Sequence, residues 1–127
     1  MKGVAFTFFV TGVVAVVFGM GWGLHMAASG DHAMAGAHAH LNLVGWASFA
    51  LFGLYYHVTP KAAASVLARI HYAVALAGLV VMVIGIALTV RGGSELPAVL
   101  GSLLTAASML IFLYTVAGNG LGGEMRG

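Results

Sequence analysis

The sequence contains no cysteine and very few charged residues, and both shortages narrow the chemistry open to it. Without cysteine the chain forms no disulfide, thiolate zinc site, iron–sulfur cluster or covalent c-type haem attachment. Charged residues make up 6% of the 127 residues and hydrophobic residues 61%, a balance that a water-soluble domain of this size would not carry. The net charge of +2 gives no reason to expect nucleic acid as a partner. The composition predicts an integral membrane protein in contact with membrane lipid, with metal chemistry limited to histidine and methionine ligands.

Four apolar stretches are each close to the ~20 residues that a helix needs to cross the hydrocarbon core of a bilayer. They predict helices at residues 3–24, 37–58, 66–90 and 96–117. The short connections between these stretches predict helices that pack as sequential antiparallel neighbours. We therefore expect an all-α fold in which residues 1–127 form a single transmembrane four-helix domain, an integral membrane four-helix bundle.

Basic residues are distributed unevenly between the predicted ends of these helices. If the N-terminus is cytoplasmic, Lys2, Lys61, Arg69 and Arg126 fall inside and only Arg91 falls outside. This is the asymmetry that the positive-inside rule describes. The sequence thus predicts a multi-pass protein of a bacterial inner (cell) membrane, with its N-terminus in the cytoplasm and its first loop outside.

Two histidines, His38 and His40, lie at the mouth of the second apolar stretch. Ionisable groups within membrane segments are rare and usually face a functional site. Residues i and i+2 of a helix point about 200° apart at ~3.6 residues per turn, so the two rings are predicted to leave the helix on opposite sides. We expect them to serve two sites, or one site that neighbouring copies of the chain build together.

The helical spacing places His38, Asn42 and Gly45 on one face, which continues through Phe49 and Phe52. Imidazole is the common axial ligand of b-type haem. Gly45 would leave room for the edge of a porphyrin, and the two phenylalanines would offer it apolar contact. The opposite face is equally apolar and carries His40, Ala47, Leu51 and Leu54. The pattern favours a site for haem b.

The Ala-His-Ala-His motif at residues 37–40 resembles the haem-ligand helices of haem-copper oxidase subunit I, the family of cytochrome c oxidases and nitric oxide reductases. In that family the second helix carries an Ala-His haem ligand, and residues 50–56 are similar to its continuation. The tenth helix carries His-x-His, whose second histidine is the other axial ligand of the low-spin haem. The family's twelve helices form three four-helix arcs. The resemblance, which covers residues 37–60, therefore implies a chain similar to one arc.

The resemblance implies a homotrimer in which His38 of one protomer and His40 of its neighbour ligate a haem iron across each interface. Other parts of the family's machinery are absent from this sequence: there is no His-Pro-Glu-Val-Tyr, no adjacent histidine pair for a copper centre, and no carboxylate within a predicted span. We therefore expect electron transport through haem b, with no oxygen reduction or proton pumping by this chain alone. Whether the chain is an oxidoreductase, and what its redox partner is, the sequence leaves open.

Arg91 is the only strong cation on the predicted outer side. Haem propionates would project toward that side, and a guanidinium group binds carboxylates well. The alternative is an interfacial arginine that pairs with Glu95 or with lipid phosphate.

A copper site at the outer side is the strongest alternative to haem. Imidazole and thioether groups gather there, as they do in copper-binding proteins, at His25, Met26, His32, Met34, His38 and His40, with Met20 nearby. His25 and His32 are also candidate ligands of a metal bound in addition to a haem.

Two further hypotheses concern the remaining histidines, His57 and His71. In a dihaem cytochrome that exchanges electrons with quinone, these two residues would ligate a second haem. In a purely structural subunit, the histidines would serve packing. From position alone we expect both to be interfacial side chains bonded to carbonyl groups or to Tyr55 and Tyr72.

Overall fold

The computed structural model describes residues 1–123, and within these residues the chain is all-helical, without a strand. Three helices are long: α1 (Gly3–Ser29), α5 (Val66–Val90) and α6 (Leu96–Asn119). Between α1 and α5, three helical elements follow one another without a break: α2 (Ala35–His40), the π-helix η1 (Leu41–Ser48) and α3 (Phe49–Val58). We call these three elements together the second rod. The short helix α4 (Pro60–Ala63) links the second rod to α5. Arg126, which we expected inside, lies outside the described residues.

The first helix extends five residues beyond its predicted end at residue 24. It stops at Gly30, which adopts a left-handed conformation (φ 71°) and donates its backbone N–H to the Met26 carbonyl at 2.9 Å. The intervening Ala-Ala-Ser sequence favours helix strongly enough to continue it. The predicted boundary was therefore wrong, and His25 lies on the helix rather than in a loop.

The other boundaries follow local signals in the sequence. Pro60 ends the second rod, because the residue before it, Thr59, takes an extended φ of −128°. Ser65 begins α5 by accepting a hydrogen bond from the Ala68 N–H at 3.2 Å. Pro97 lies in the first turn of α6, where its missing N–H costs nothing. The predicted helix at 66–90 matches α5 at both ends.

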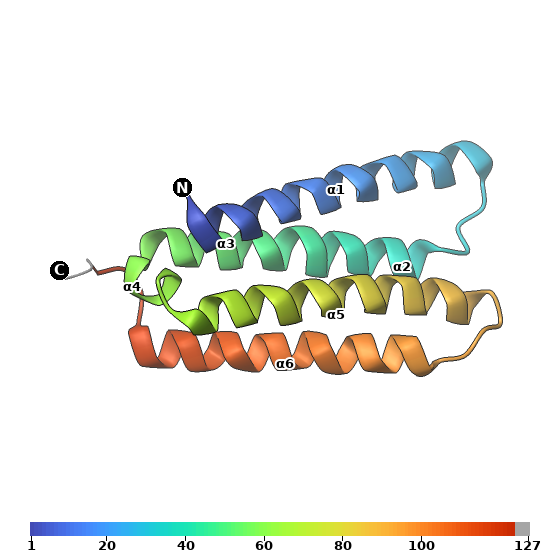
Figure 1. Ribbon diagram of the computed structural model, residues 1–127. Coiled ribbons are helices and arrows are strands. Elements are labelled where there is room, and N and C mark those ends of the chain that lie inside the picture. The colour runs from blue at the N-terminus through green and yellow to red at the C-terminus, as the bar shows by residue number, and fades with distance from the viewer. Residues whose placement is uncertain (124–127) are drawn as a thin grey trace.

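Each of the four long units, which are α1, the second rod, α5 and α6, runs antiparallel to the next one in the chain, as predicted (Figure 1). The second rod packs against α1 on one side and α5 on the other, and the pairs of α1 with the second rod and of α5 with α6 are equally extensive. The second rod and α5 thus lie in the centre, and α1 and α6 lie at opposite edges (Figure 1).

An aromatic cluster around Phe8 joins α1 to the two central rods. Phe8 is completely buried, and its ring centroid lies 5.1–5.6 Å from those of Phe49, Phe52, Tyr56 and Tyr72. Each such aromatic pair adds about 0.5–1.5 kcal/mol to the free energy of burial. The aromatic part of the core therefore lies in the half of the molecule where α1 begins.

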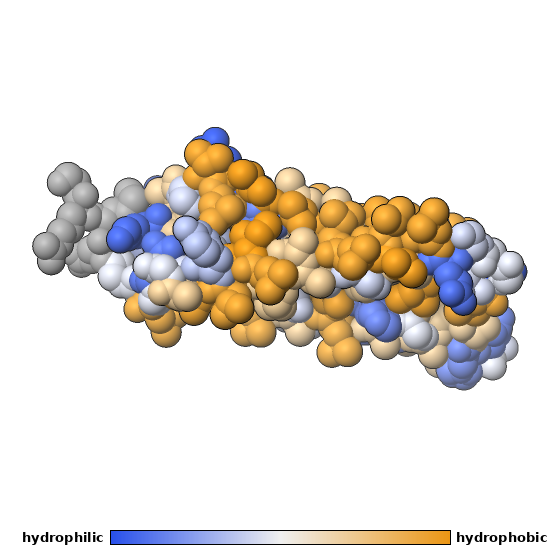
Figure 2. Space-filling view, turned by 90° about the horizontal axis from the view of Figure 1, so that it is seen from below, coloured by the Kyte–Doolittle hydropathy of each residue, from blue (hydrophilic) through white to orange (hydrophobic). Residues whose placement is uncertain are grey.

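The surface is apolar along its middle and hydrophilic mainly at its two ends (Figure 2). Large apolar side chains such as Phe18, Leu110 and Tyr114 are 65–72% exposed there. Three helices, α1, α5 and α6, are long and apolar enough to cross a membrane. These features are compatible with a multi-pass membrane protein.

The two ends of the molecule differ in their side chains. One end carries Lys2, Lys61 and Arg69, and we call it the basic end. The other carries His25, His32, His38, His40 and Arg91, and we call it the histidine end.

Candidate functional site

His38 lies in α2 at the histidine end and packs against Gly23 of α1. A Cβ atom on Gly23 would lie 3.2 Å from Cε1 of the His38 ring and 3.6 Å from its Nε2. The ring is half-buried, and its Nδ1 atom is buried without a hydrogen-bond partner. An imidazole nitrogen in this state is costly and calls for an explanation.

Asn42 repeats this arrangement one helical turn further along the second rod. Its side-chain amide packs directly against Gly19 of α1, where no side chain would fit without a shift of the amide. Its Oδ1 atom is also buried and unpartnered. Gly19 and Gly23 are four residues apart, as are Asn42 and His38, so two glycines of α1 form a cradle for two consecutive polar side chains. We call these four residues the glycine cradle.

His40 leaves the second rod in a different direction and is exposed. Its Nδ1 lies 2.7 Å from the Gly36 carbonyl oxygen. A carbonyl oxygen only accepts, so Nδ1 carries the proton and Nε2 keeps its lone pair. In many metal-binding histidines, a hydrogen bond from the other ring nitrogen to a carbonyl group holds the ring in orientation. His40 is thus an exposed histidine whose ring is held in orientation through Nδ1.

The structure separates the two faces of the second rod into an inward and an outward face, a difference that their equal apolarity did not predict. The face that begins at His38 is at least partly buried throughout, whereas His40, Leu51 and Leu54 of the opposite face are exposed. Within residues 1–123, no three histidine or acidic side chains lie close enough together to hold one metal ion.

The lower part of the inward face is filled by protein. The room expected at Gly45 is taken by α1 and α5, because a Cβ there would lie 2.8 Å from the Ala15 Cβ and 3.4 Å from Leu79 Cδ2. Phe49 and Phe52 belong to the aromatic cluster around Phe8. Gly45 therefore serves close helix packing here, and the expected macrocycle contacts at the two phenylalanines were wrong.

Two adjoining cavities lie at and below the histidine end. The larger, about 670 Å³, is an open apolar groove between α1 and α5, within the size range of cofactor sites. Its lining is Phe18, Trp22, Leu41, Leu79, Val80, Val83 and Ile84. The smaller, about 110 Å³, is more polar. Trp22 lines both cavities, so they are neighbours, and Gly23 of the cradle follows Trp22 in the chain.

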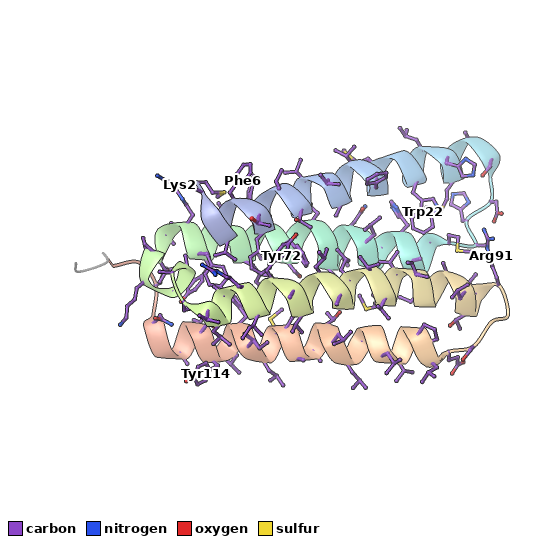
Figure 3. The ribbon with its side chains drawn as sticks, in the orientation of Figure 1. Lys2, Phe6, Trp22, Tyr72, Arg91 and Tyr114 are labelled. Carbon is purple, nitrogen blue, oxygen red and sulfur yellow. The ribbon has the colours of Figure 1, made fainter. Side chains whose placement is uncertain are left out.

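The smaller cavity gathers residues from α1, the first loop and the end of α5. Its lining is Trp22, His25, Met26, Asp31, Met34 and Arg91. Figure 3 shows Trp22 and Arg91 at the same end of the molecule. Three of the predicted copper ligands, His25, Met26 and Met34, thus come together. His32, His38 and His40 are not part of this group, and the His32 Nδ1 instead bonds the Gly30 carbonyl at 3.1 Å.

His71 is the polar residue whose surroundings the sequence interpretation missed. It is completely buried, and its Nδ1 bonds the Tyr56 hydroxyl at 2.9 Å, whereas we expected an interfacial histidine beside Tyr55 or Tyr72. Phe52 and Phe112 lie against its ring, at centroid distances of 4.6 and 5.6 Å. The burial had a detectable signal, because His71 shares a face of α5 with small and apolar residues at helical spacing: Ala68, Ala75, Gly78, Leu79 and Met82.

His57, the proposed partner of His71 in a second haem site, is exposed. The structure therefore buries one ring within the aromatic core and leaves the other on the surface. This arrangement does not support a second haem between them.

No family model, curated protein or solved structure matches this chain. The resemblance to haem-copper oxidase subunit I rests on residues 37–60 of the sequence alone.

Proposed function

We propose that this protein is a four-span membrane haem protein of the bacterial inner membrane, with His38 and His40 as axial ligands of haem b. The observation that carries the proposal is the difference in burial and hydrogen bonding between the two imidazoles. His38 is half-buried with an unpartnered Nδ1, and His40 is exposed with its Nε2 lone pair free. Two imidazoles are a donor set that suits a six-coordinate b-type haem.

Neighbouring protomers supply the two ligands. The rings leave the second rod on different faces, so one chain cannot direct both at a single iron. His40 lies on an exposed apolar face with Leu51 and Leu54, a surface suited to another copy of the chain as well as to lipid. The resemblance to one arc of a three-arc oxidase subunit favours a homotrimer, with one haem at each interface.

The groove beside Trp22 is the seat that we propose for the macrocycle. It is apolar, of cofactor size, and adjoins the pocket that contains Arg91, while His38 and His40 lie outside its lining. A haem there would bury its ring against Phe18 and Trp22, and the guanidinium of Arg91 would hold a propionate. Asn42 lies one helical turn from His38. Its unpartnered Oδ1 is packed against Gly19.

Electron transfer is the reaction that suits this site. A haem held by two imidazoles supplies one-electron oxidation and reduction with no open coordination position. Among residues 1–123 the acidic side chains are Asp31 and Glu95, both in loops at the histidine end. With no carboxylate in the apolar rods, the described chain offers no acidic relay for protons across the membrane.

The second rod completes the four spans, and the N-terminus is cytoplasmic in this proposal. The three long helices satisfy the length and hydropathy requirement by themselves. The second rod, Ala35–Val58, is uninterrupted and lies between α1 and α5. Lys2, Lys61 and Arg69 then lie inside, as the positive-inside rule favours.

Visible absorption spectra of the purified protein, oxidised and dithionite-reduced, test haem binding. We expect a Soret band and sharp reduced α and β bands in the wild type, and their loss in His38→Ala and in His40→Ala. His57→Ala is the matched control, because His57 is an exposed histidine at the basic end. A wild-type protein without a Soret band after haem supplementation would falsify the proposal.

Co-expression of the two inactive variants tests ligation between protomers. A mixed trimer of His38→Ala and His40→Ala chains contains one interface with both histidines intact. We therefore expect doubly tagged mixed assemblies to regain part of the haem absorbance that each variant lacks alone. Absorbance that stays absent in the mixed assembly would place both ligands within one chain and contradict the trimer.

Copper binding is the second candidate, and the smaller cavity favours it. His25, Met26 and Met34 line this pocket of about 110 Å³, and imidazole with thioether ligands suits Cu(I). Elemental analysis of wild type and Met34→Leu separates the candidates. Copper that disappears in Met34→Leu, with no Soret band in the wild type, would move the function to this pocket.

A further inference from the structure

A third cavity, of about 370 Å³, lies at the basic end, opposite the end that carries His38 and His40. It is bounded by the first two turns of α1, the junction of α4 with α5, and the first turns of α5. Its polar side chains are Thr7, Arg69 and Tyr72, and the remainder of its lining is small or aliphatic. This cavity plays no part in the proposed haem site.

The local sequence explains why this cavity is open and firmly walled. Ala63 ends α4 and Ala64 follows it, and both fill little space beside Arg69. The Tyr72 hydroxyl lies 2.8 Å from that of Thr11, whose own proton goes to the Thr7 carbonyl at 2.7 Å. Tyr72 is therefore the donor to Thr11, and its ring is fixed as one wall of the cavity. Figure 3 shows Tyr72 below the start of α1, where Lys2 and Phe6 are labelled.

The cavity is electrostatically one-sided. Arg69 is exposed and supplies a guanidinium group to the lining, and Lys2 and Lys61 lie at the same end. Within residues 1–123 the carboxylate side chains, Asp31 and Glu95, lie at the opposite end. Guanidinium binds phosphate with two parallel hydrogen bonds, so the cavity is complementary to a phosphate anion.

The position of the cavity selects a lipid as the source of that phosphate. It lies in the first turns of the apolar helices α1 and α5, next to the charged residues of the basic end, and headgroups lie at this depth of a membrane protein. The residues next to Thr7 and Arg69 in the chain, Phe6 and Ile70, are apolar and about half exposed, at 51% and 48%. A headgroup in the cavity could therefore leave its acyl chains along these side chains.

We propose that the cavity beside Arg69 binds the phosphate headgroup of an anionic phospholipid. Basic pockets between membrane helices are suited to such headgroups. The site would hold a lipid at the end of the bundle that contains the aromatic core. Lipid binding there does not depend on haem.

Native mass spectrometry of protein taken from nanodiscs of phosphatidylglycerol and phosphatidylcholine tests this assignment. We expect wild type to retain phosphatidylglycerol selectively, and Arg69→Gln to lose on the order of tenfold in retention, as for a charged hydrogen-bonded contact. Lys61→Gln is the matched control, because it removes a cation at the same end outside the cavity lining. Equal losses in the two variants would indicate diffuse surface charge and overturn the proposal.

A second variant tests the cavity rather than its charge. Ala64 is exposed and lines the cavity, so Ala64→Phe fills the space and keeps Arg69. We expect the same loss of phosphatidylglycerol, with an unchanged circular dichroism spectrum. Retention unaffected in Ala64→Phe would contradict binding in the cavity.

Inorganic phosphate distinguishes the two sources of the anion. If phosphate at millimolar concentration displaces phosphatidylglycerol from wild type, the site binds free anions and the lipid assignment is wrong. Lipid retention and its displacement by phosphate are measured independently of the Soret band, so these experiments do not test the haem proposal.

Discussion

At the scale of single residues, four buried side-chain atoms among residues 1–123 have no hydrogen-bond partner. They are His38 Nδ1, Asn42 Oδ1, His71 Nε2 and Thr105 Oγ1. Each unsatisfied polar group of this kind costs about 1–3 kcal/mol. His38 and Asn42 lie one turn apart in the glycine cradle, so the cost is concentrated beside the proposed haem site, where ligation by iron would orient the His38 ring.

The buried pair of Tyr56 and His71 gives a residue-scale prediction. Tyr56→Phe leaves both nitrogens of a buried imidazole unpartnered, so we expect a loss of about 1–3 kcal/mol in the free energy of unfolding. His71→Phe strands the tyrosine hydroxyl but also removes the unpartnered Nε2, and we expect a smaller loss. Thermal and denaturant unfolding in detergent measures both.

The double variant separates the hydrogen bond from packing. Because Tyr56→Phe with His71→Phe removes both polar partners, its destabilisation is expected to be about 1 kcal/mol or more below the sum of the single changes. Strictly additive losses would mean that the 2.9 Å contact does not couple the two side chains.

At the scale of elements, glycines decide how closely α5 and α6 approach. A Cβ on Gly78 would lie 2.8 Å from the Thr105 backbone nitrogen. Cβ atoms on Gly85 and Gly101 would run into the backbones of Ala98 and Met82. Backbone atoms cannot turn aside as a side chain can, so these three positions exclude any larger residue without helix separation.

Alanine substitutions at glycines test this packing. We expect Gly101→Ala to destabilise the protein by about 1–3 kcal/mol, as overpacking does. Gly21→Ala is the matched control, since Gly21 lies within α1 with nothing near its Cβ position. The control is expected to be neutral or to gain about 0.5–1 kcal/mol from helix propensity. Similar unfolding midpoints for the two variants would contradict the close α5–α6 approach.

The π-helix η1 is the other feature at this scale. It begins directly after His40 and contains Asn42 and Gly45. Its wider turn is reflected in the Ser48 hydroxyl, which donates to the Leu43 carbonyl five residues earlier at 3.3 Å. π-Segments occur frequently at functional sites, and this one joins the proposed ligand pair to the aromatic core.

At the scale of the whole molecule, the membrane topology is a question of which connections between helices lie at which end. The loops at residues 30–34 and 91–95 lie at the histidine end, and the turn at residues 59–65 lies at the basic end (Figure 1). A second rod that spans the membrane puts these two ends on opposite sides of the bilayer.

The absence of cysteine makes this topology directly measurable. Single variants Ala33→Cys, Ser94→Cys and Ala64→Cys place one thiol at an exposed position in each connection. We expect an impermeant thiol reagent to label the first two from the outside of intact cells and Ala64→Cys only after the membrane is opened. If Ala64→Cys reacts from the same side as Ala33→Cys, the second rod does not cross.

Much of the fold was legible in the sequence, because burial in lipid demands long apolar segments with internally satisfied backbones. The approximate positions of the helices and their order followed from hydropathy, and the division of the second rod into two faces followed from helical spacing. The end of α1 was misjudged, because His25 suggested a loop although the chain continues in helix to Gly30.

The sequence alone determined that the histidine pair diverges, since helical geometry fixes the directions of residues i and i+2. Only the tertiary structure decided what each face meets. It packed His38 and Asn42 against glycines of α1, filled the space at Gly45 with Ala15 and Leu79, and enclosed His71 beside Tyr56. Contacts between helices depend on side chains far apart in the chain, and spacing within one helix carries no information about them.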